Sequence, residues 1–463
     1  MHNPMITFSV PSNFVGICSV FAMFLLQTGG LHDYGKGKRV HFTPESVRGP
    51  PKKEGTAYGF GVFLLLLGQR YATGKERECI FLLFSQIRNL RRTIMKRSII
   101  VMTAALAAAC SEAPKTEVVI GTYGERLYTY TFNHQTLEFT ETANAKAWNA
   151  SYALAEGGCI FAVSEVGSES GAYSFAHQKG QGIELTAEHR QTGADPCFVM
   201  IYEDPDTGKY MMTADYSGGS VSVFPIEDGR IGERVEQICF EGSGPVSARQ
   251  EASHIHQLKK VPGAQGYILA SDLGADVIRL LKAGKCEGTT ADTGALKLEH
   301  IKDIPCPAGS GPRHMEFSAD GKRLYCIAEL SGEVLVYGAG SDGEPSFSLV
   351  QRIQADEVNA GGSADIHIHP SGKWIYTSHR LDNDGISIFN INEDGTLEKC
   401  GYARTGRHPR NFMITPDGEL LLVACRDDRL IQVFTIEKDG TLTLTPSKLV
   451  FESDMPSSIT AVL

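Results

Sequence analysis

The feature that most constrains this chain is a strand pattern that recurs about every fifty residues. Runs of alternating apolar, β-branched or aromatic residues end at positions 175, 224, 280, 337, 389 and 434, and consecutive end points are 49, 56, 57, 52 and 45 residues apart. An earlier copy ends at Tyr130, which gives seven units. Several short strands in a period of this length are typical of a β-propeller, whereas the repeats of a solenoid are usually shorter.

The sequence therefore predicts an all-β fold, a seven-bladed β-propeller of mostly four-stranded antiparallel blades over residues 117–463. A closed ring of blades leaves few exposed strand edges, so it avoids edge-to-edge aggregation. We expect the last strand, around 457–462, to close the ring beside the first strand.

One unit, residues 309–337, shows the plan of a blade. Strands are predicted at 314–317, 323–328 and 333–337, and Asp320-Gly321 supplies a tight turn because glycine tolerates a positive φ. Arg313 precedes the first strand and Glu329 follows the second. In an up-and-down meander these two places lie at the same end of the sheet, so the pattern predicts a charge pair there.

Charge is distributed unevenly along the chain. The net charge is −10, but residues 1–94 carry +7 and residues 111–463 carry −19. The acidic body argues against nucleic-acid binding, because neutralising phosphates requires clustered Lys and Arg. It remains compatible with a small anionic substrate, because a local group of Arg can dominate the field inside a cleft.

Residues 95–110 resemble a bacterial lipoprotein signal peptide. Lys96 and Arg97 form a charged start, residues 98–106 are mostly apolar, and small residues precede Cys110. Such a segment is a processing signal and not a membrane span. The resemblance implies lipidation of Cys110, a tether over 111–116 and a location in the cell envelope; if the signal is not used, a cytoplasmic location follows. The alternative for this segment is a buried helix of a globular domain.

Residues 1–94 contain apolar stretches shorter than the roughly 20 residues that a membrane-spanning helix needs. They show no persistent helical or strand period. We expect translation to begin at Met95, which would make residues 1–94 an upstream extension. A membrane-associated leader is the alternative.

The cysteines and histidines form no recognisable metal-binding pattern. No CxxC pair and no Cys/His spacing typical of zinc occurs. Several cysteines lie in apolar runs, so most are expected to be buried thiols, although a location outside the cytoplasm would permit a disulfide or two. The pairs His254/His256 and His367/His369 could each present two rings on one strand face. One ring at a ligand site and one structural ring is the favoured interpretation, so neither a metal nor a cofactor is predicted.

Candidate site residues are those at one mouth of the central channel of a propeller, where the loops entering the innermost strands converge. They either precede or begin the first strand of a unit, or follow its second strand. The first group comprises His254, His256, Arg313, His314, Asp365, His367, His408, Arg410 and Asn411. The second group comprises Asp215, Tyr216, Asp272, Glu329 and Arg380.

These residues lie in motifs that resemble those of the seven-bladed β-propeller lactonase family, which includes propeller-type 6-phosphogluconolactonases and fungal carboxymuconate lactonizing enzymes. The matching motifs occupy 213–224, 254–256, 271–276, 309–314 with 329–330, 364–367 with 379–380, and 408–412. The resemblance implies a catalytic set of His256, Arg313, Glu329 and Arg380. Substrate binding is expected from His254, His314, Asp365, His367 and Arg410. An unusual turn at 261–266 leaves the choice between His254 and His256 open.

Lactone hydrolysis needs a polarised carbonyl, an activated water and a proton for the leaving alkoxide. Arg stays protonated and can hold carboxylate or phosphate groups and stabilise an oxyanion, which suits Arg313 and Arg380. Glu329 or His256 would then activate water. An Arg partner would keep Glu329 ionised and favour His256 as the proton carrier. The sequence contains no G-x-S-x-G elbow and no dinucleotide fingerprint, which argues against covalent acyl catalysis and nucleotide binding.

The resemblance therefore implies a metal-independent hydrolase of the 6-phosphogluconolactonase type, whose substrate is a small anionic or sugar lactone. We expect a monomer or dimer, no nucleic-acid partner, and contact with a membrane only through lipidated Cys110. Two alternatives remain open. One is a cycloisomerase that forms a lactone, and the other is a propeller that binds a ligand without catalysis.

Overall fold

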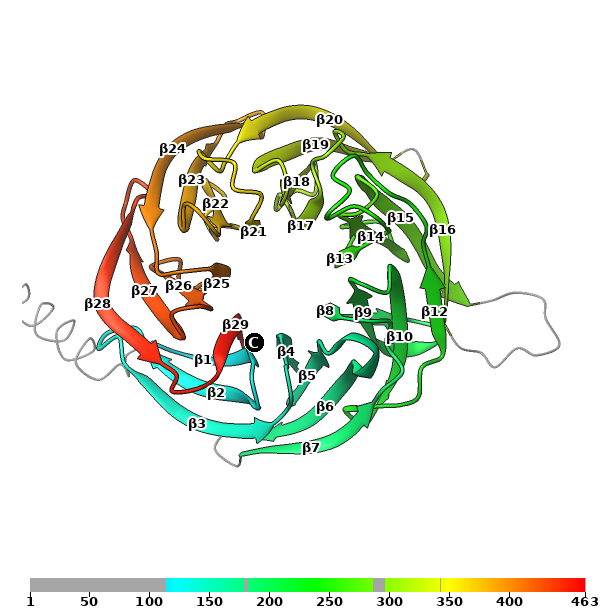
Figure 1. Ribbon diagram of the computed structural model, residues 1–463, viewed down its shortest axis with the longest axis horizontal. Coiled ribbons are helices and arrows are strands. Elements are labelled where there is room, and N and C mark those ends of the chain that lie inside the picture. Colours follow the sequence, from blue (N-terminus) through cyan, green and yellow to red (C-terminus); the bar gives the residue numbers. More distant parts are fainter. Residues whose placement is uncertain (1–113, 179–181, 286–295, 342, 463) are drawn as a thin grey trace, which may run out of the picture. The chain divides into compact units, whose positions relative to one another are not determined.

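Seven antiparallel sheets surround a central axis in the computed structural model, and each sheet is one blade of a ring (Figure 1). The structure describes residues 114–178, 182–285, 296–341 and 343–462. The predictions for 1–94, for the signal segment 95–110 with Cys110, and for 111–113 lie outside the described residues. The predicted seven-bladed propeller is confirmed.

The strands follow the chain from blade to blade, with the innermost strand of each sheet first (Figure 1). The first three sheets are β29 (Met455–Ala461), β1 (Lys115–Tyr123), β2 (Arg126–Asn133) and β3 (Phe139–Lys146); β4 (Tyr152–Glu156), β5 (Cys159–Ser164), β6 (Gly171–Gln178) and β7 (Gly182–His189); and β8 (Pro196–Asp204), β9 (Gly208–Asp215), β10 (Ser220–Glu227), β11 (Arg230–Ile231) and β12 (Glu236–Cys239).

The last four sheets have four strands each. They are β13 (Ile255–Lys260), β14 (Tyr267–Asp272), β15 (Val277–Lys285) and β16 (Leu296–Pro305); β17 (Pro312–Phe317), β18 (Arg323–Ala328), β19 (Glu333–Ser341) and β20 (Pro345–Gln354); β21 (Ser363–Ile368), β22 (Trp374–His379), β23 (Gly385–Ile391) and β24 (Leu397–Arg404); and β25 (Pro409–Ile414), β26 (Leu420–Cys425), β27 (Leu430–Ile436) and β28 (Leu442–Val450).

The third sheet departs from the four-stranded plan because β11 and β12 both pair with β10, so that two short strands occupy its outer edge. A single 3₁₀ turn, η2 (Gly167–Glu169), interrupts the second blade between β5 and β6. Within the described residues, no helix is long and apolar enough to cross a membrane.

The ring closes where the last strand joins the first. β29 pairs with β1 in antiparallel register, with Ile459 opposite Ile120 and Thr460 opposite Val119, as the sequence predicted. Strand β1 begins at Lys115, so Lys115 and Thr116, which were assigned to the tether, pair with β2 instead. The β-branched Thr116 is buried, which explains why the strand extends this far.

The residue that ends each repeat in the sequence is a core residue between blades. Phe175, Phe224, Tyr337, Phe389 and Phe434 are all at most 1% exposed, and each belongs to a different apolar cluster. Burying one such ring contributes roughly 1.5–3 kcal/mol. The fourth repeat ends at buried Leu280 instead of an aromatic residue, so the period near fifty residues reflects one large apolar anchor per blade.

The described cysteines are unpaired thiols, of which Cys197, Cys326 and Cys425 are buried. Burial raises the pKa of the Cys425 thiol to about 12. These three therefore behave as small apolar side chains. Of the other described cysteines, Cys159 and Cys306 are half-buried and Cys239 and Cys400 are exposed, so the prediction that most are buried is confirmed for three of seven.

Register shifts interrupt the innermost strands at the end where the site residues lie. They occur in β8 between Pro196 and Phe198, in β13 between Ile255 and Gln257, in β17 between Pro312 and His314, in β21 between Ser363 and Ile366, and in β25 between Pro409 and Asn411. A bulge leaves a residue out of the ladder and redirects its side chain. The residues released in this way include Cys197, His256, Arg313, Asp365 and Arg410.

Candidate active site

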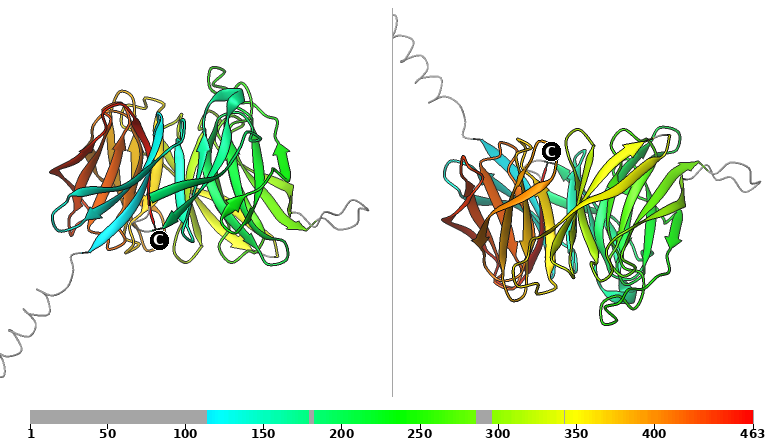
Figure 2. Two further views of the ribbon diagram at one scale, coloured as in Figure 1. Left: turned by 90° about the horizontal axis from the view of Figure 1, so that it is seen from below. Right: turned by 90° about the horizontal axis from the view of Figure 1, so that it is seen from above.

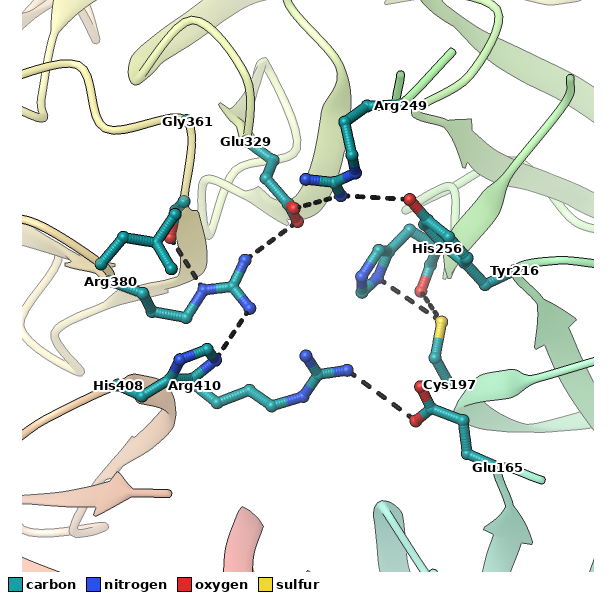
Figure 3. A pocket seen from close by; sticks show the side chains of 12 residues that line it. Glu165, Cys197, Tyr216, Arg249, His256, Glu329, Gly361, Arg380, His408 and Arg410 are labelled. Carbon is teal, nitrogen blue, oxygen red and sulfur yellow. Dashed lines mark hydrogen bonds and ion pairs between the residues drawn. The ribbon is translucent and has the colours of Figure 1, made fainter. Parts of the chain in front are cut away.

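A pocket of about 320 Å³ opens at one end of the central channel (Figure 3). Eight of its twelve lining residues are polar or charged. The lining residues are Glu165, Cys197, Tyr216, Arg249, His256, Glu329, Gly361, Gly362, Arg380, Leu381, His408 and Arg410. Ligand pockets in proteins usually span about 300–1,000 Å³, so the volume suits one small molecule of monosaccharide size.

Two structural positions, repeated from blade to blade, supply most of this lining. The first is the bulge of an innermost strand, which contributes Cys197, His256 and Arg410. The second is the residue directly after the second strand of a blade, which contributes Glu165, Tyr216, Glu329 and Arg380. Both positions lie at the same end of each sheet because consecutive strands are antiparallel.

Glu329 is the centre of a charge cluster. Its Oε2 accepts from Arg313 Nε at 2.8 Å and lies 3.1 Å from Arg380 Nη2, while its Oε1 accepts from Arg249 Nη2 at 2.6 Å. Burial raises the pKa of Glu329, but the charges of Arg380, Arg313 and Arg249 outweigh it and bring that pKa to about 2. Glu329 is therefore a carboxylate at neutral pH, and a weak base.

The cluster holds more positive than negative charge. Burial, together with the charges of nearby Arg313 and Arg410, lowers the pKa of Arg380 to about 9 against the attraction of Glu329. Arg410 lies 3.8 Å from Glu165 and stacks over the ring of Tyr123 at 5.2 Å, so its guanidinium is only loosely paired. Figure 3 shows Arg380 and Arg410 pointing into the open space.

His256 is the neutral base of the pocket. Burial holds its pKa well below the ordinary value of 6.5, and the charges of Arg313 and Arg410 add to this effect. Its Nδ1 lies 3.7 Å from the Cys197 thiol, and its ring contacts Tyr216 edge to face at 5.6 Å. The imidazole is therefore neutral at neutral pH, and the same low pKa makes it a weak base unless nearby negative charge offsets these effects.

His254 does not line the pocket. Its ring stacks on Tyr216 with centroids 4.4 Å apart, and its Nδ1 lies 3.0 Å from the Tyr216 carbonyl. The structure places His256 in the pocket lining and His254 against Tyr216, which favours His256 in the choice that the sequence left open, while its catalytic role stays a prediction. Both residues contact the same tyrosine from different sides.

Arg313 lies beneath the pocket and not in its lining. Its side chain is 2% exposed, and its Nη1 donates to the Ala364 carbonyl at 2.5 Å. It contacts Glu329 through Nε. The structure therefore brings the predicted Arg313–Glu329 pair together, and makes Arg313 a group that positions Glu329.

The other predicted binding residues form a polar layer further along the channel. Asp365 accepts from His314 Nδ1 at 2.7 Å and contacts His367 Nε2 at 3.0 Å. His367 also lies 3.2 Å from Glu316, and despite burial these two carboxylates raise its pKa to about 10. His314, Asp365 and His367 do not line the pocket, but the ring of His314 contacts that of His256 edge to face at 5.2 Å, so this layer adjoins the site.

His408 fixes the orientation of Arg380. The guanidinium can only donate, so His408 Nε2 is the acceptor in the 3.3 Å contact with Arg380 Nη1. Burial lowers the pKa of His408 to about 2, which keeps the acceptor lone pair available. Arg380 Nε donates in turn to the Gly362 carbonyl at 2.8 Å.

Sequence reasoning missed Arg249, Glu165 and Cys197 as lining residues. Glu165 follows the second strand of its blade, so the rule that selected Glu329 would have selected it. Cys197 occupies the bulge position of β8, and a cysteine at this place in the sequence does not by itself predict a bulge. Arg249 belongs to neither position, and its only sequence signal is the charged run Arg249-Gln250-Glu251 shortly before the histidine pair.

The described side chains in and around the pocket do not form a metal-binding group. In the stretches that the structure describes, no three His, Cys, Asp or Glu side chains come together in a way that could hold a metal ion. The pair His254/His256 is divided between Tyr216 and the pocket, and His367 is bound by Asp365 and Glu316.

Comparison with known proteins decides the family. The model of a family described as the seven-bladed β-propeller lactonases matches residues 117–460. The chain belongs to this lactonase family. The fold and the family expected from the sequence are thereby confirmed, and the protein is a hydrolase of cyclic carboxylic esters.

Individual relatives agree with this assignment. A 6-phosphogluconolactonase of Formosa agariphila is 36% identical over 263 residues, covering 56% of this chain and 72% of the relative. A 6-phosphogluconolactonase of Bacillus subtilis is 28% identical over 343 residues, covering 71% and 93%. The crystal structure of a candidate 6-phosphogluconolactonase from Bacteroides fragilis is 36% identical, with a TM-score of 0.69 over 75% of this chain and 98% of that chain.

Proposed function

We propose that this propeller lactonase hydrolyses a sugar lactone of the 6-phosphogluconolactone type. The observation that carries the proposal is the pocket itself, where a neutral imidazole and three Arg side chains face one space of about 320 Å³. The names of the most similar relatives support the same substrate class. Hydrolysis of such a lactone would give the open aldonic acid, a step in carbohydrate metabolism.

The guanidinium groups of Arg380 and Arg410 are suited to the lactone carbonyl. Both point into the pocket and neither is fully compensated by a carboxylate (Figure 3). As water adds to the carbonyl carbon, negative charge develops on the carbonyl oxygen, and fixed N–H donors stabilise that charge without reorganising. A site of this kind lowers the barrier by several kcal/mol for each good donor, on the order of 3.

His256 is suited to move the proton. Its neutral imidazole takes a proton from the attacking water, and the resulting hydroxide adds to the carbonyl carbon. When the tetrahedral intermediate collapses, the ring C–O bond breaks and the imidazolium returns the proton to the leaving alkoxide. The products are a hydroxyl group and a carboxylic acid, which releases its proton to solvent to give the carboxylate, and the imidazole is neutral again.

Glu329 has a different part in this scheme. Three guanidiniums hold it as a carboxylate, so it fixes Arg380 and Arg249 in place and favours the imidazolium of His256 electrostatically. An anionic substrate would add to that effect, because it offsets the positive charges that disfavour protonation of His256. The site is therefore better matched to an anionic lactone than to a neutral one.

The test is lactone hydrolysis by the purified protein, followed as acid release on 6-phosphogluconolactone and on gluconolactone. We expect turnover above the spontaneous rate, and a fall in kcat of about 10²–10³ in Arg380→Gln and Arg410→Gln. A folded protein that accelerates neither lactone would overturn the proposal. The same outcome would direct attention to lactone formation from a dicarboxylate.

We also propose that the propeller is carried as a lipid-anchored protein of the cell envelope. The support is the segment 95–110, with its charged start, apolar run and Cys110. Expression of the whole chain and of Cys110→Ser in a bacterium, with labelled palmitate and membrane fractionation, tests this. Label and membrane association in the parent but not in the variant are expected, and an unlabelled soluble parent would contradict it.

A further inference from the structure

Arg249 reaches the pocket from a segment that the other blades lack. The connection between β12 and β13 spans residues 240–254, which is fifteen residues, whereas the other six connections between blades range from four residues (405–408, 451–454) to eight (355–362). The other charged lining residues come from bulges or from the ends of second strands. Arg249 is thus an addition to the common framework of the site.

The backbone that carries Arg249 is held firmly. Its neighbour Gln250 is fully buried, and the Gln250 side chain accepts from Val246 N at 3.0 Å and donates to the Leu273 carbonyl at 2.9 Å. The Gln250 carbonyl also accepts from Gly244 N at 3.0 Å. The loop therefore presents the Arg249 side chain from a fixed base, as a binding group requires.

The tip of Arg249, in contrast, is accessible. Its side chain is 39% exposed, compared with 2% for Arg313 and 7% for Arg380, the other two guanidiniums on Glu329. Arg313 and Arg380 are also tied to the carbonyls of Ala364 and Gly362. Arg249 is therefore the most solvent-exposed of the three guanidiniums around Glu329.

The guanidinium of Arg249 also has N–H groups that could bind a ligand. Within the part of the chain that the structure describes, its side-chain contacts use Nη2 alone, to Glu329 Oε1 at 2.6 Å and to the Tyr216 hydroxyl at 3.1 Å. Two parallel N–H bonds to one anion need two adjacent guanidinium nitrogens, and both such edges include Nη2. A bidentate contact with a phosphate therefore requires that Arg249 lose its hydrogen bond to either Glu329 or Tyr216.

The weaker partner is the tyrosine. A hydrogen bond to a carboxylate is shorter and stronger than one to a neutral hydroxyl, and the two distances follow that order. Displacement of the Tyr216 hydroxyl frees a hydrogen on Nη2 and leaves the pair with Glu329 intact. The carboxylates of Glu329 and Glu165 also line the pocket, but Arg249, Arg380 and Arg410 together leave its lining net cationic, which favours an incoming anion.

We propose that Arg249 is a specificity-determining residue, which binds the remote anionic group of the substrate in exchange for the Tyr216 hydroxyl. Phosphate is the group that matches a two-pronged guanidinium contact at a partly exposed position. This inference rests on the proposed sugar-lactone hydrolysis and adds to it the basis of discrimination. It predicts that phosphorylated lactones are preferred because of this one loop residue.

The test compares kcat/KM on 6-phosphogluconolactone with kcat/KM on gluconolactone, in the whole protein and in Arg249→Gln. We expect the ratio of the two constants to fall by at least about tenfold in the variant, since a charge-assisted hydrogen bond is lost for one substrate only. A merely structural role would lower both constants by the same factor and leave the ratio unchanged, which would overturn the inference while the proposed function stands.

The control is Arg352→Gln. Arg352 is also an exposed Arg on a glutamate, with Nη2 2.9 Å from Glu333 Oε2, but it lies on the outer strand β20. It should leave the ratio unchanged.

A binding measurement makes the inference independent of turnover. Calorimetric titration with 6-phosphogluconate and with gluconate should show tighter binding of the phosphorylated acid by the parent protein, and loss of that difference in Arg249→Gln. Tyr216→Phe, which removes the competing hydroxyl, should keep the difference. Equal affinities of the parent for both acids, or a difference that survives in Arg249→Gln, would overturn the inference even if no lactone were hydrolysed.

Discussion

At the scale of single residues, the site is a balance of charges around one carboxylate. Glu329 is 5% exposed and contacts three guanidiniums, so the positive charge of each guanidinium is partly balanced by the same carboxylate. Removing one partner of a buried ion pair leaves the other uncompensated, which typically costs about 3–5 kcal/mol. Glu329 is thus as important for holding the pocket together as for the reaction.

This balance predicts a specific acid sensitivity. The pKa of Glu329 lies near 2 in the folded protein, below its ordinary value of 4.5, so ionised Glu329 stabilises the fold fully above pH 4.5 and loses that effect as the pH falls toward 2. The size of the effect is about 3 kcal/mol. In urea unfolding, the difference in stability between the parent and Glu329→Gln should therefore shrink between pH 4.5 and pH 2.

A difference that stays constant over this range would contradict the proposed charge balance. Glu333→Gln is a suitable control, because Glu333 pairs with exposed Arg352 on an outer edge and surface pairs contribute only about 0–1 kcal/mol. Its effect on stability should be small at every pH.

The histidine pair allows a second prediction. His256→Gln removes the neutral imidazole from the pocket and should lower kcat by about 10²–10⁴ with little change in KM, as expected for loss of a general base. His254→Gln removes the stacking partner of Tyr216, so it should act mainly on KM. Steady-state kinetics on both variants check this, and a larger loss of kcat in His254→Gln would reverse the assignment.

Single residues were predictable from the sequence only where a repeated position carried an unusual side chain. Arg313, Glu329 and Arg380 stood out because charged residues flanked apolar strands at the same end of a blade. Arg380 lines the pocket, whereas Arg313 is buried outside its lining. This difference depends on the direction of each side chain, and the spacing of residues in the sequence does not encode side-chain direction. Arg249 lay outside every repeated position.

At the scale of strands, the bulges of the innermost strands explain what the alternation of residues could not. Strict alternation predicted that His254 and His256 share a strand face, but β13 starts at Ile255 and shifts register at His256. One extra residue redirects a side chain and does not alter the apolar pattern on either side. The strand positions were therefore predictable, and the direction of the site residues was not.

The loops that bring these strands to the mouth require particular glycines, which gives an element-scale prediction. Gly311, just before β17, has φ +62, and a Cβ there would lie 2.7 Å from Leu330 Cγ and 2.9 Å from its Cδ1. Gly311→Ala therefore combines an unfavourable backbone with a steric clash, and should lower stability by about 2–4 kcal/mol. It should also reduce activity, because Arg313 lies two residues further on.

Gly372 provides the comparison. Its φ is +71, but a Cβ there would meet nothing within 4 Å, since it lies in a turn between β21 and β22. Gly372→Ala should cost only the backbone term, about 1–2 kcal/mol, with unchanged kcat. Thermal unfolding and assay of both variants distinguish the two terms, and equal losses would show that the contact with Leu330 is unimportant.

At the scale of the whole molecule, ring closure and the site are physically connected. Figure 2 shows the blades side on, and β29 lies at the inner end of its sheet beside the channel in Figure 1. Ile459 in β29 donates its backbone N–H to Asn411 Oδ1 at 2.7 Å, and Asn411 Nδ2 donates to Asp365 Oδ2 at 2.5 Å. The closing strand therefore supports the polar layer beneath the pocket.

Closure was predictable from the sequence in outline. Seven repeats, a strand-like end and the need to cover the edge of the first strand all favour a ring. The link from Ile459 through Asn411 to Asp365 was not predictable, because it joins three blades whose mutual distances only the folded ring defines.

Removal of residues 455–463 should therefore damage the molecule beyond the loss of one strand. The edge of β1 would be exposed, because Val119 and Ile120 would lose their partners in β29, and such an edge promotes association between chains. The buried Ile459 would also leave its cluster, and Asn411 would lose its backbone partner. We expect a lower melting temperature, oligomers in light scattering, and little lactonase activity.

A synthetic peptide of residues 455–463 distinguishes an open ring from a generally damaged fold. If the truncated chain keeps its other blades, the peptide can add to the free edge of β1, because strand addition at an exposed edge supplies main-chain hydrogen bonds and side-chain pockets together. It should restore monomers and part of the activity. A peptide with Asp at position 459 should fail to do so, since that carboxylate would have to enter an apolar cluster where Ile459 is 1% exposed. A truncated protein that remains monomeric and active without the peptide would show that the ring does not depend on this strand for closure.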